Sequence, residues 1–535
     1  DDSGQPLKHR RLRNDPVVGP LWQHAAHLEF IKLVEQHKNM HFINKSQIPH
    51  GRTVSYYNPQ CKIKNGLYRV RGTVGGNITD FTGERSAYTA DQTTFKILTQ
   101  HCVSAGWKFS TADISDMYLH TVLDEPEYMW ISKSDIPDET WQHFDLDRYC
   151  APGEARIAVE ITGGIYGLPQ AGNLAQRKLI ALLARHGYVQ TNTTCLFKHK
   201  DGKPILFTLT VDDFAIAYLG DEDEKLYAAL RTEYPLKVDP LGKKYCGITV
   251  QFSADRSYVD LSMPGYVQHA LRQLNVTVTR PEHSPERYMP KTYGSKQPQK
   301  PTEDTSPSLN EAEVKRLQSI VGIFLWYARS IDGTMLGTVN RIASRQANPT
   351  KNVLAMAEHM MQYAGTYPDA TLRYRKSDMI LRADSDASYL SEANARSRAA
   401  AYIFLGNRDP TFHNHPIECM SSIITTVVTA ASEAEYASTF LTGCIAYPLR
   451  QTLEEMGWPQ PPTNITTDNK TACGIANRTT KMKRSKAMDM RWHWIRDKVD
   501  QGEFTVHWRA GKHSVADFLT KAHPSSHCRE QRYLY

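Results

Sequence analysis

The stretch Ile205-Leu-Phe-Thr-Leu-Thr-Val-Asp-Asp-Phe-Ala-Ile-Ala-Tyr218 places two adjacent carboxylates, Asp212 and Asp213, between two runs of apolar and β-branched residues. Such runs favour β-strands, so the stretch predicts a β-hairpin with the two carboxylates at its tip. Carboxylates held against a hydrophobic hairpin are unfavourable unless a cation compensates them. By itself, the hairpin fits a solvated turn as well as a cation site.

A third carboxylate, Asp113, lies in a similar setting within Trp-Lys-Phe-Ser-Thr-Ala-Asp-Ile-Ser-Asp-Met-Tyr-Leu (107–119). Aspartates from separate strands can together hold a pair of Mg²⁺ ions, for which Mn²⁺ is a chemical substitute. We expect Asp113, Asp212 and Asp213 to form such a site, with the backbone carbonyl of Ile114 as an additional ligand. A pair of metal ions held in this way suits phosphoryl transfer during nucleotide polymerisation.

Composition is consistent with a multidomain protein that binds a polyanion. The chain has 535 residues, 40% of them hydrophobic, and a net charge of +7, so we expect several domains with ordinary cores. The nine cysteines are scattered without a CxxC pair, which argues against a zinc knuckle or a disulfide framework and favours a reducing compartment. No apolar run approaches the length of a membrane span, and we expect no membrane partner.

The pattern along the chain predicts four regions. Residues 1–50 form an N-terminal extension, and residues 51–262 form a first domain in which strands dominate beyond residue 110. Residues 263–372 form a helical segment with a Pro-rich linker at 276–308. Residues 373–535 form a second domain of alternating strands and helices. Between 51 and 110 the pattern indicates only short strands and Gly-rich turns. Amphipathic periodicity predicts helices at 21–34, 173–186, 266–274, 311–329 and 352–363, and strands at 371–385 and 399–405.

A second acidic set occupies the last 160 residues of the sequence. Asp386 ends an apolar strand, Glu433 lies in a helical pattern, Asp468 ends another strand and Asp517 begins a final helix. Four such carboxylates could bind two Mg²⁺ ions and position a water molecule for attack on a phosphodiester. Asp384 is an alternative to Asp386, and Glu435 is an alternative to Glu433.

Several motifs resemble the reverse transcriptase of copia-type LTR retrotransposon polyproteins. They are Ala112-Asp-Ile-Ser-Asp-Met-Tyr-Leu119, Gly164-Ile-Tyr-Gly-Leu-Pro-Gln-Ala171, Leu209-Thr-Val-Asp-Asp213 and Tyr245-Cys-Gly-Ile248, in the order and at the separations of that family. The resemblance covers about residues 28–521. It implies an α/β (α+β) fold, in which a right-hand polymerase of fingers, palm and thumb is followed by a ribonuclease H-like α/β domain.

The resemblance also implies residue roles in nucleotide and primer binding. Tyr118 aligns with the aromatic steric gate that excludes a 2′ hydroxyl, although a core tyrosine is the alternative. Gln170 would lie beside the incoming nucleotide. Arg69 and Arg71 align with a basic fingers strand that contacts the triphosphate through the bidentate guanidinium, and a solvated strand face is the alternative. The primer grip corresponds to Tyr245, Cys246 and Gly247.

The C-terminal acidic set resembles ribonuclease H of the same family. The matching motifs are Ser432-Glu-Ala-Glu-Tyr436, Thr467-Asp-Asn-Lys-Thr-Ala472 and Ala516-Asp-Phe-Leu-Thr-Lys521. The distance from Asp386 to Tyr402 matches the family and favours Asp386 over Asp384. The basic residues Lys483, Arg484 and Lys486 could contact the backbone of a hybrid duplex, or form a solvated loop. We expect His513 to be a surface residue.

This sequence departs from the family at Thr210, where an aromatic residue that touches the primer or template is usual, and in the fingers at Gly72-Thr-Val-Gly-Gly-Asn77. The implied function is RNA- and DNA-templated DNA synthesis from dNTPs, together with cleavage of RNA in RNA–DNA hybrids. The implied location is the cytoplasm, in virus-like particles, and the nucleus, as a monomer or homodimer. The alternative is a domesticated protein that binds or scaffolds nucleic acid without catalysis.

Overall fold

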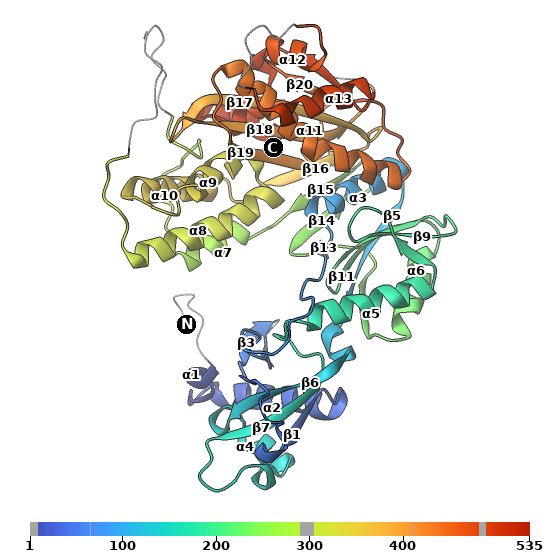
Figure 1. Cartoon of the computed structure of the whole chain (residues 1–535), viewed down its shortest axis with the longest axis vertical. Helices are drawn as coiled ribbons and strands as arrows, with labels where there is room; N and C mark the ends of the chain where they lie inside the picture. The colour runs from blue at the N-terminus through green and yellow to red at the C-terminus, as the bar shows by residue number, and fades with distance from the viewer. Residues whose placement is uncertain (1–8, 65, 289–303, 410, 481–487) are drawn as a thin grey trace.

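The computed structural model describes residues 9–64, 66–288, 304–409, 411–480 and 488–535. Figure 1 shows an N-terminal lobe at one end of the molecule, a sheet with flanking helices in the middle, and a C-terminal domain at the other end. A group of helices lies beside the C-terminal domain. We name these parts the fingers, the palm, the C-terminal domain and the thumb helices.

The fingers contain a four-stranded sheet in the order β1-β7-β6-β2 and a separate hairpin. The elements are α1 (His9–Arg13), α2 (Gly19–Ile31), β1 (Met40–Ile43), β2 (Val54–Tyr56), β3 (Gln60–Lys64), β4 (Leu67–Arg71), β6 (Val122–Ser132), α4 (Asp138–His143) and β7 (Arg156–Gly163). The β3–β4 hairpin packs on α2 through an edge-to-face contact of Trp22 and Tyr68, whose ring centroids are 4.8 Å apart. Its position therefore depends on the helix that precedes it.

The palm is a six-stranded sheet in the order β12-β5-β11-β10-β9-β8. Its strands are β5 (Lys108–Ile114), β8 (Tyr188–Gln190), β9 (Leu196–His199), β10 (Ile205–Thr210), β11 (Asp213–Tyr218) and β12 (Leu236–Asp239), and its helices are α5 (Ala171–Arg185) and α6 (Glu222–Arg231). Leucines of both helices pack on Phe207, Phe214 and Ile216 of the central strands. The apolar runs that surround Asp212 and Asp213 in the sequence are therefore the core of this sheet.

A third sheet joins the palm to the C-terminal half. It has the order β13-β14-β15-β16, with β13 (Lys244–Tyr245), β14 (Ile248–Phe252), β15 (Tyr258–Ser262) and β16 (Thr371–Arg375). The thumb helices are α7 (Tyr266–Gln273), α8 (Glu311–Ser330), α9 (Leu336–Ala343) and α10 (Lys351–Thr366). β16 pairs with β15 along its whole length, so the strand that spans residue 372 belongs to the same sheet as residues 244–262.

The C-terminal domain is built on a five-stranded mixed sheet in the order β19-β18-β17-β20-β21. Its elements are β17 (Ile380–Glu392), β18 (Arg396–Gly406), β19 (Glu418–Ile424), α11 (Ala431–Glu455), β20 (Thr463–Thr467), α12 (Lys470–Ala476), α13 (Trp494–Asp500), β21 (Phe504–Trp508) and α14 (Ser525–Gln531). β17, β18 and β19 are antiparallel, whereas β20 and β21 run parallel to β17. This is the mixed α/β domain expected after the polymerase part.

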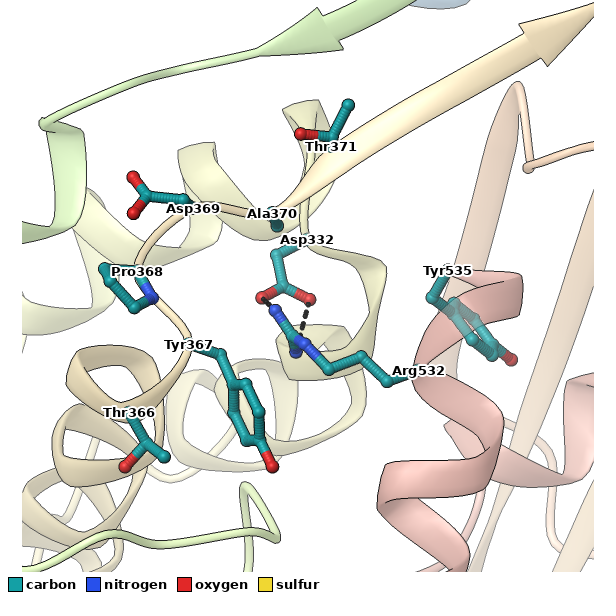
Figure 2. A pocket seen from close by; sticks show the side chains of 9 residues that line it. All are labelled: Asp332, Thr366, Tyr367, Pro368, Asp369, Ala370, Thr371, Arg532 and Tyr535. Carbon is teal, nitrogen blue, oxygen red and sulfur yellow. Dashed lines mark hydrogen bonds and ion pairs between the residues drawn. The ribbon is translucent and has the colours of Figure 1, made fainter.

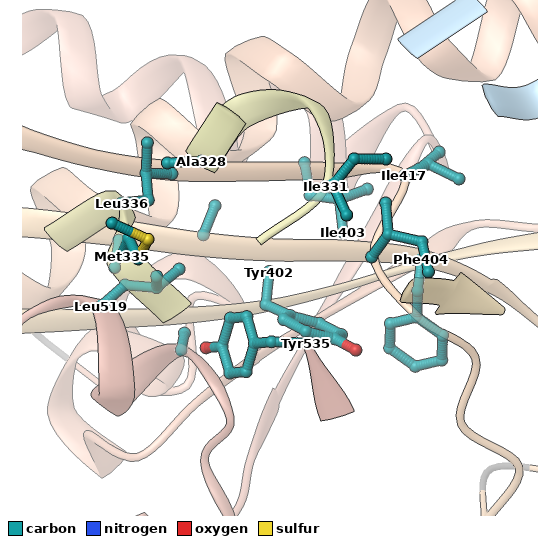
Figure 3. Close-up of a cluster of buried hydrophobic side chains, with 14 of the residues drawn as sticks. Ala328, Ile331, Met335, Leu336, Tyr402, Ile403, Phe404, Ile417, Leu519 and Tyr535 are labelled. Atoms are coloured by element: carbon teal, nitrogen blue, oxygen red, sulfur yellow. The ribbon is translucent and has the colours of Figure 1, made fainter. Parts of the chain in front are cut away.

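Helix α3 (Gln92–Ala105) and the thumb helices share one apolar core with the C-terminal domain. Figure 3 shows part of this core, where Ile331, Met335 and Leu336 meet Tyr402 and Tyr535. Polar contacts add to it, because Thr93 Oγ1 donates to Glu418 at 2.5 Å and Gln100 Nε2 donates to Ser377 at 3.0 Å. The two halves of the chain are therefore packed together rather than only tethered.

The predicted elements are largely confirmed. The hairpin at 205–218 is present, and the predicted helices correspond to α2, α5, α7, α8 and α10. Helix α3 was missed, because the pattern between 51 and 110 indicated only strands and turns. The predicted strand at 371–385 is two strands, β16 and the start of β17. Within the described residues, no helix combines the length and apolarity needed to cross a membrane.

Candidate functional sites in the palm and the C-terminal domain

The tip of the β10–β11 hairpin positions Asp212 and Asp213. The two strands pair up to Thr210 and Asp213, so only Val211 and Asp212 form the turn. Val211 has a φ of 59°, a left-handed conformation that is unfavourable for a β-branched residue and is concentrated at functional sites. Asp213 also pairs directly with Asp113 of β5, and residues opposite each other on antiparallel strands have neighbouring side chains. The three predicted aspartates therefore form one cluster, which we name the palm site.

A cavity of about 390 Å³ opens over the palm site. Five cationic residues line it together with the three aspartates and Ile114, namely Lys32, Lys64, Arg69, Arg71 and Lys237. Glu29 and Asp116 also line the cavity, and both form ion pairs with Lys32. Lys237 Nζ lies 3.6 Å from Asp113 Oδ2, and the Arg71 guanidinium lies over the Tyr166 ring at 4.0 Å from its centroid. The structure thus brings the predicted Arg69 and Arg71 to the carboxylates, and it adds three lysines that the sequence analysis missed.

The carboxylates of the palm site are not fully compensated by these cations. Burial, reinforced by the carboxylates of Asp212 and Asp113, raises the pKa of Asp213 to about 6. Burial also raises the pKa of Asp212, and Asp113 contributes to this rise. Oxygen ligands with excess negative charge are the donor set that Mg²⁺ and Mn²⁺ prefer, so the residues present fit a divalent cation.

The predicted primer-grip residues lie beside the palm site. The Tyr245 hydroxyl is hydrogen-bonded to Thr210 Oγ1 at 2.8 Å, and Cys246 Sγ donates to Asp213 Oδ2 at 3.7 Å. Gly247 has a φ of 87°, which glycine adopts without strain. Thr210, where the sequence departs from the family, therefore holds the tyrosine of this turn through its hydroxyl.

Tyr118 and Gln170 have different surroundings. Tyr118 is half-buried against Tyr166, with ring centroids 5.3 Å apart, and its pKa is raised by burial and by the nearby carboxylate of Asp212. Gln170 instead lines a separate cavity of about 430 Å³, where its Nε2 donates to Glu127 Oε1 at 3.2 Å. Its predicted position at the nucleotide site does not match this structure, because Glu127 binds the side-chain amide away from the palm site.

In the C-terminal domain, Asp386, Glu435 and Asp468 each have a ligand atom within 4.8 Å of the others. Asp384 of β17 pairs with Thr466 of the parallel strand β20. Asp386 and Asp468 each lie two residues after this pair along the chain, so the two carboxylates are at the same level of the sheet. Helix α11 supplies Glu435 from above the sheet. We name this cluster, together with the neighbouring Asp517, the C-terminal acidic site.

The structure corrects the choice between Glu433 and Glu435. Glu433 turns back to the start of α11, where its Oε2 accepts hydrogen bonds from Thr429 N at 2.7 Å and Thr429 Oγ1 at 2.8 Å. Two helical positions are about 200° apart around the axis, so only one of these glutamates can face the sheet. Glu435 does so, which makes the expected role of Glu433 as a ligand wrong.

The structure also separates Asp386 from Asp384. Asp384 forms an ion pair with Arg509, so its charge is already compensated. Asp386 Oδ1 is buried and has no hydrogen-bond partner among the described residues, while Asp386 Oδ2 accepts a hydrogen bond from Thr520 Oγ1 at 2.5 Å. A buried oxygen without a partner, beside two further carboxylates, fits a divalent cation.

Lys521 is the main counter-charge of the C-terminal acidic site. Its ammonium forms an ion pair with Asp517 and lies 3.7 Å from Asp386 Oδ2. Burial lowers the pKa of Lys521, but Asp386 and Asp517 outweigh burial and raise it overall. Burial raises the pKa of Asp386 and of Glu435, and neighbouring carboxylates add to both rises. The sequence analysis missed Lys521, although it ends the motif that contains Asp517.

Two further features surround this site. Trp508 is 45% exposed at the end of β21, and its Nε1 donates a hydrogen bond to the Asp468 carbonyl at 2.8 Å. Lys470 Nζ lies over the Trp508 ring, 4.4 Å from its centroid. His513 is exposed, as expected, and lines a cavity of about 610 Å³ that also contains Asp517. The predicted basic residues Lys483, Arg484 and Lys486 lie outside the described residues.

Comparison with known proteins agrees with the sequence motifs. The chain is 24% identical over 428 residues to the retrovirus-related Pol polyprotein from transposon TNT 1-94 of Nicotiana tabacum, covering 77% of this chain and 29% of that protein. It is 25% identical over 438 residues to the corresponding polyprotein from transposon RE1 of Arabidopsis thaliana, covering 80% of this chain and 27% of that protein. The homologues of this chain are retrovirus-related Pol polyproteins.

This finding confirms the predicted resemblance to a retrotransposon polyprotein. The chain spans less than a third of the length of these two relatives. No protein-family model matches it. Among solved structures it is similar to a foamy viral protease-reverse transcriptase in complex with double-stranded DNA, with a TM-score of 0.49, 13% identity, and coverage of 90% of this chain and 68% of that one.

Proposed function

We propose that the chain is an RNA- and DNA-templated DNA polymerase of a copia-type retrotransposon, with an attached ribonuclease H. DNA synthesis is assigned to Asp113, Asp212 and Asp213. Cleavage of RNA in RNA–DNA hybrids is assigned to Asp386, Glu435, Asp468 and Asp517. The observation that carries the proposal is the palm site, where three clustered aspartates and the cationic residues Lys64, Arg69 and Arg71 of the fingers hairpin line one cavity.

The cationic side chains suit a dNTP. Lys64, Arg69 and Arg71 come from the fingers hairpin and face the aspartates of the palm, so a triphosphate between them would contact both lobes. Arginine binds phosphate oxygens through a bidentate fork, and Tyr166 holds the Arg71 guanidinium by stacking on it. These residues would orient the triphosphate and neutralise its charge.

The remaining palm residues would position the primer and select the sugar. Tyr118, half-buried near Asp212, would pack against the ribose and exclude a 2′ hydroxyl. The turn at Tyr245, Cys246 and Gly247 would place the primer end beside Asp213, with Thr210 holding the tyrosine. Bound Mg²⁺ or Mn²⁺ would supply Lewis-acid stabilisation of phosphate charge at either site.

In the C-terminal domain, Asp386, Glu435 and Asp468 would hold the cation, and Asp517 completes the acidic site beside Lys521. The partners that follow are a primed RNA or DNA template, an RNA–DNA hybrid and dNTPs. Recognition by backbone and shape is expected for such duplexes. Residence in virus-like particles of the cytoplasm, entry into the nucleus, and a monomeric or homodimeric state stay predictions.

Primer extension on an RNA template, with Mg²⁺ and dNTPs, tests the polymerase assignment. Asp213→Asn should abolish extension and leave hybrid cleavage intact, because the two acidic sites lie on separate sheets. Asp468→Asn should abolish hybrid cleavage and leave extension intact. Loss of both activities from either change in a folded protein would refute the two-site assignment.

The domesticated binding protein predicts a different result. In that case wild-type protein binds the template–primer but makes no DNA and leaves a hybrid intact. Extension without hybrid cleavage would restrict the function to the palm site and identify a silent nuclease. Binding of template–primer is therefore measured in the same samples.

A further inference from the structure

A thumb helix contacts the segment that carries the last acidic residue of the C-terminal site. Arg341 of α9 is only 7% exposed, and its Nη2 donates to the backbone carbonyl of Thr520 at 2.8 Å. Thr520 lies between Asp517 and Lys521, and it is fully buried. A residue outside the predicted C-terminal domain thus holds the backbone of its acidic site.

Thr520 transmits this contact to Asp386. Its Oγ1 donates to Asp386 Oδ2 at 2.5 Å and also contacts the Asp517 carbonyl at 3.0 Å. The other oxygen of Asp386 is the buried one without a partner among the described residues. Thr520 therefore leaves one Asp386 oxygen free and fixes the direction in which it points, and Arg341 fixes Thr520.

Two carboxylates, of which Glu392 is buried and Glu286 is partly exposed, set the orientation of Arg341. It forms ion pairs with Glu286 and with Glu392, the second at 3.3 Å, and Glu392 also pairs with the buried Arg398 at 2.6 Å. Paired charges of this kind do little for stability overall, but each depends on its partners because an unpaired buried charge is strongly unfavourable. The guanidinium therefore has little freedom to leave the Thr520 carbonyl.

Close packing keeps α9 against the same segment. A Cβ at Gly337 would lie 2.9 Å from the Leu519 carbonyl oxygen, so the helix backbone approaches the segment as only glycine permits. Ser421 Oγ donates to the same Leu519 carbonyl at 2.8 Å, and Asn340 Nδ2 donates to the Ser421 carbonyl at 2.8 Å. Figure 3 shows Leu336 and Leu519 within the shared core.

An ion pair also fixes the C-terminal segment to the connection between the thumb helices α8 and α9. Arg532 donates to Asp332 through Nη2 at 2.9 Å, and Figure 2 shows this pair beside Tyr367 at a cavity of about 330 Å³. The Arg532 guanidinium also lies over the Tyr367 ring at 4.4 Å. The thumb helices thus hold the chain on both sides of helix α14, so α9 and residues 517–521 belong to one packed unit.

We propose that Arg341 is a positioning residue of the C-terminal acidic site, acting through Thr520 on Asp386. The proposal rests on the proposed ribonuclease H function for its effect on catalysis. It makes hybrid cleavage dependent on a thumb helix, so residues 373–535 alone lack a part of their own site. Groups that orient metal ligands in this way typically change metal affinity or activity by about 10- to 100-fold when they are removed.

The test uses the full chain with Arg341→Met and Thr520→Val, with Thr520→Ser as the variant that keeps the hydroxyl. Arg316→Met is the matched control, because Arg316 of α8 also donates to a backbone carbonyl, that of Leu274 at 2.7 Å, away from the acidic site. Hybrid cleavage is measured as kcat and KM, and primer extension reports whether the polymerase half remains folded.

We expect Arg341→Met and Thr520→Val to lower the kcat of hybrid cleavage about 10- to 100-fold, with the KM for hybrid and primer extension unchanged. Thr520→Ser and Arg316→Met should retain wild-type cleavage. Equal cleavage by Thr520→Val and wild type would overturn the proposal. If Arg341→Met also abolishes primer extension, the substitution has unfolded the chain. The comparison of Thr520→Val with Thr520→Ser then decides whether the Thr520 hydroxyl positions Asp386.

A metal-binding readout separates this proposal from the proposed function. In chains that also carry Asp212→Asn and Asp213→Asn, Mn²⁺ binding followed by water proton relaxation reports on the C-terminal site. Thr520→Val should weaken Mn²⁺ binding about tenfold or more in this background, whether or not the wild type cleaves hybrids. Unchanged Mn²⁺ binding would refute positioning, whereas weakened binding in a wild type without cleavage would refute only the nuclease.

Discussion

Replacing Asp213 by Asn should stabilise the metal-free protein, because the palm site holds more negative charge than its surroundings compensate. The pKa of Asp213 rises from 3.8 to about 6 through burial and through the carboxylates of Asp212 and Asp113. A folded state that raises the pKa of a carboxyl group binds its proton more tightly than the unfolded chain does. Ionisation of Asp213 therefore lowers the free energy of unfolding.

The structure sets the size and the pH window of this effect. A rise from 3.8 to about 6 corresponds to about 3 kcal/mol, at about 1.4 kcal/mol for each tenfold change in proton affinity. Because the site opens to solvent, screening reduces the effect to about 1 kcal/mol. The destabilisation is absent below the unfolded pKa of 3.8, develops as pH rises toward about 6, and is complete above it.

The assay is thermal unfolding in EDTA, followed across pH. At about pH 8, Asp213→Asn should unfold about 2 °C above wild type, and the difference should vanish near pH 4. Asp124→Asn is the control, because Asp124 is an exposed carboxylate for which no partner is found among the described residues. Mg²⁺ should raise the unfolding temperature of wild type more than that of Asp213→Asn, because the ion compensates the same charge.

Two results would refute this reasoning. One is a gain for Asp213→Asn that equals the gain for Asp124→Asn at every pH, because that would reflect net charge alone. The other is a gain in unfolding temperature that is as large near pH 4 as above pH 6. Near pH 4 the Asp213 carboxyl group of the wild type is protonated and uncharged, so its replacement should have no electrostatic effect there.

Three further predictions follow from named contacts. Tyr118→Ala should let ribonucleotides enter the product, measured as rNTP against dNTP incorporation, and unchanged sugar selectivity would contradict the packing role of Tyr118. Lys521→Met should increase the rise in unfolding temperature that Mg²⁺ causes, because the Lys521 ammonium beside Asp517 and Asp386 competes with the ion. An equal rise in the wild type and in Lys521→Met would argue against competition. Val211→Gly should stabilise the metal-free chain by about 1 kcal/mol by relieving the left-handed φ, as measured by urea unfolding, and a loss of stability would show that the turn is not strained.

The palm site was accessible from sequence because its signals are local. The apolar runs that flank Asp212 and Asp213 form β10 and β11, which are buried almost without interruption. A continuous apolar and β-branched run of this length is visible without any tertiary information. Asp113 lies in a run of the same kind, which forms β5. This strand pairs with β11 and places Asp113 directly opposite Asp213. Homology to Pol polyproteins agrees with this assignment of the fold.

Helix α3 escaped sequence analysis because both of its sides are buried. Thr93, Lys96, Thr99 and Gln100 are all buried although they are polar, since the palm and the C-terminal domain enclose the helix. An amphipathic pattern arises only when one face meets water. A helix between two domains therefore shows no apolar stripe. Thr93, Lys96 and Gln100 are hydrogen-bonded to partners more than 200 residues away, such as Glu418.

Tertiary contacts also decided that Glu435, and not Glu433, belongs to the C-terminal acidic site. Both glutamates lie in one helical motif, and local pattern cannot say which of them faces β17. The structure decides it, because Glu433 accepts hydrogen bonds from Thr429 ahead of the helix, whereas Glu435 lies with Asp386 and Asp468. Likewise Gln170 has the expected motif but binds Glu127.

Sequence alone determined the hairpin and the order of the two acidic sets, because apolar runs and the acids within them are properties of neighbouring residues. The mixed α/β fold with a polymerase part followed from the resemblance of the motifs to a known family. Only the tertiary structure decided that Glu435 rather than Glu433 joins the C-terminal acidic site, which lysines lie beside the two sets of carboxylates, and that Arg341 of a thumb helix holds Thr520. Those contacts join residues far apart in the chain, and close packing selects among side chains that local patterns leave equivalent.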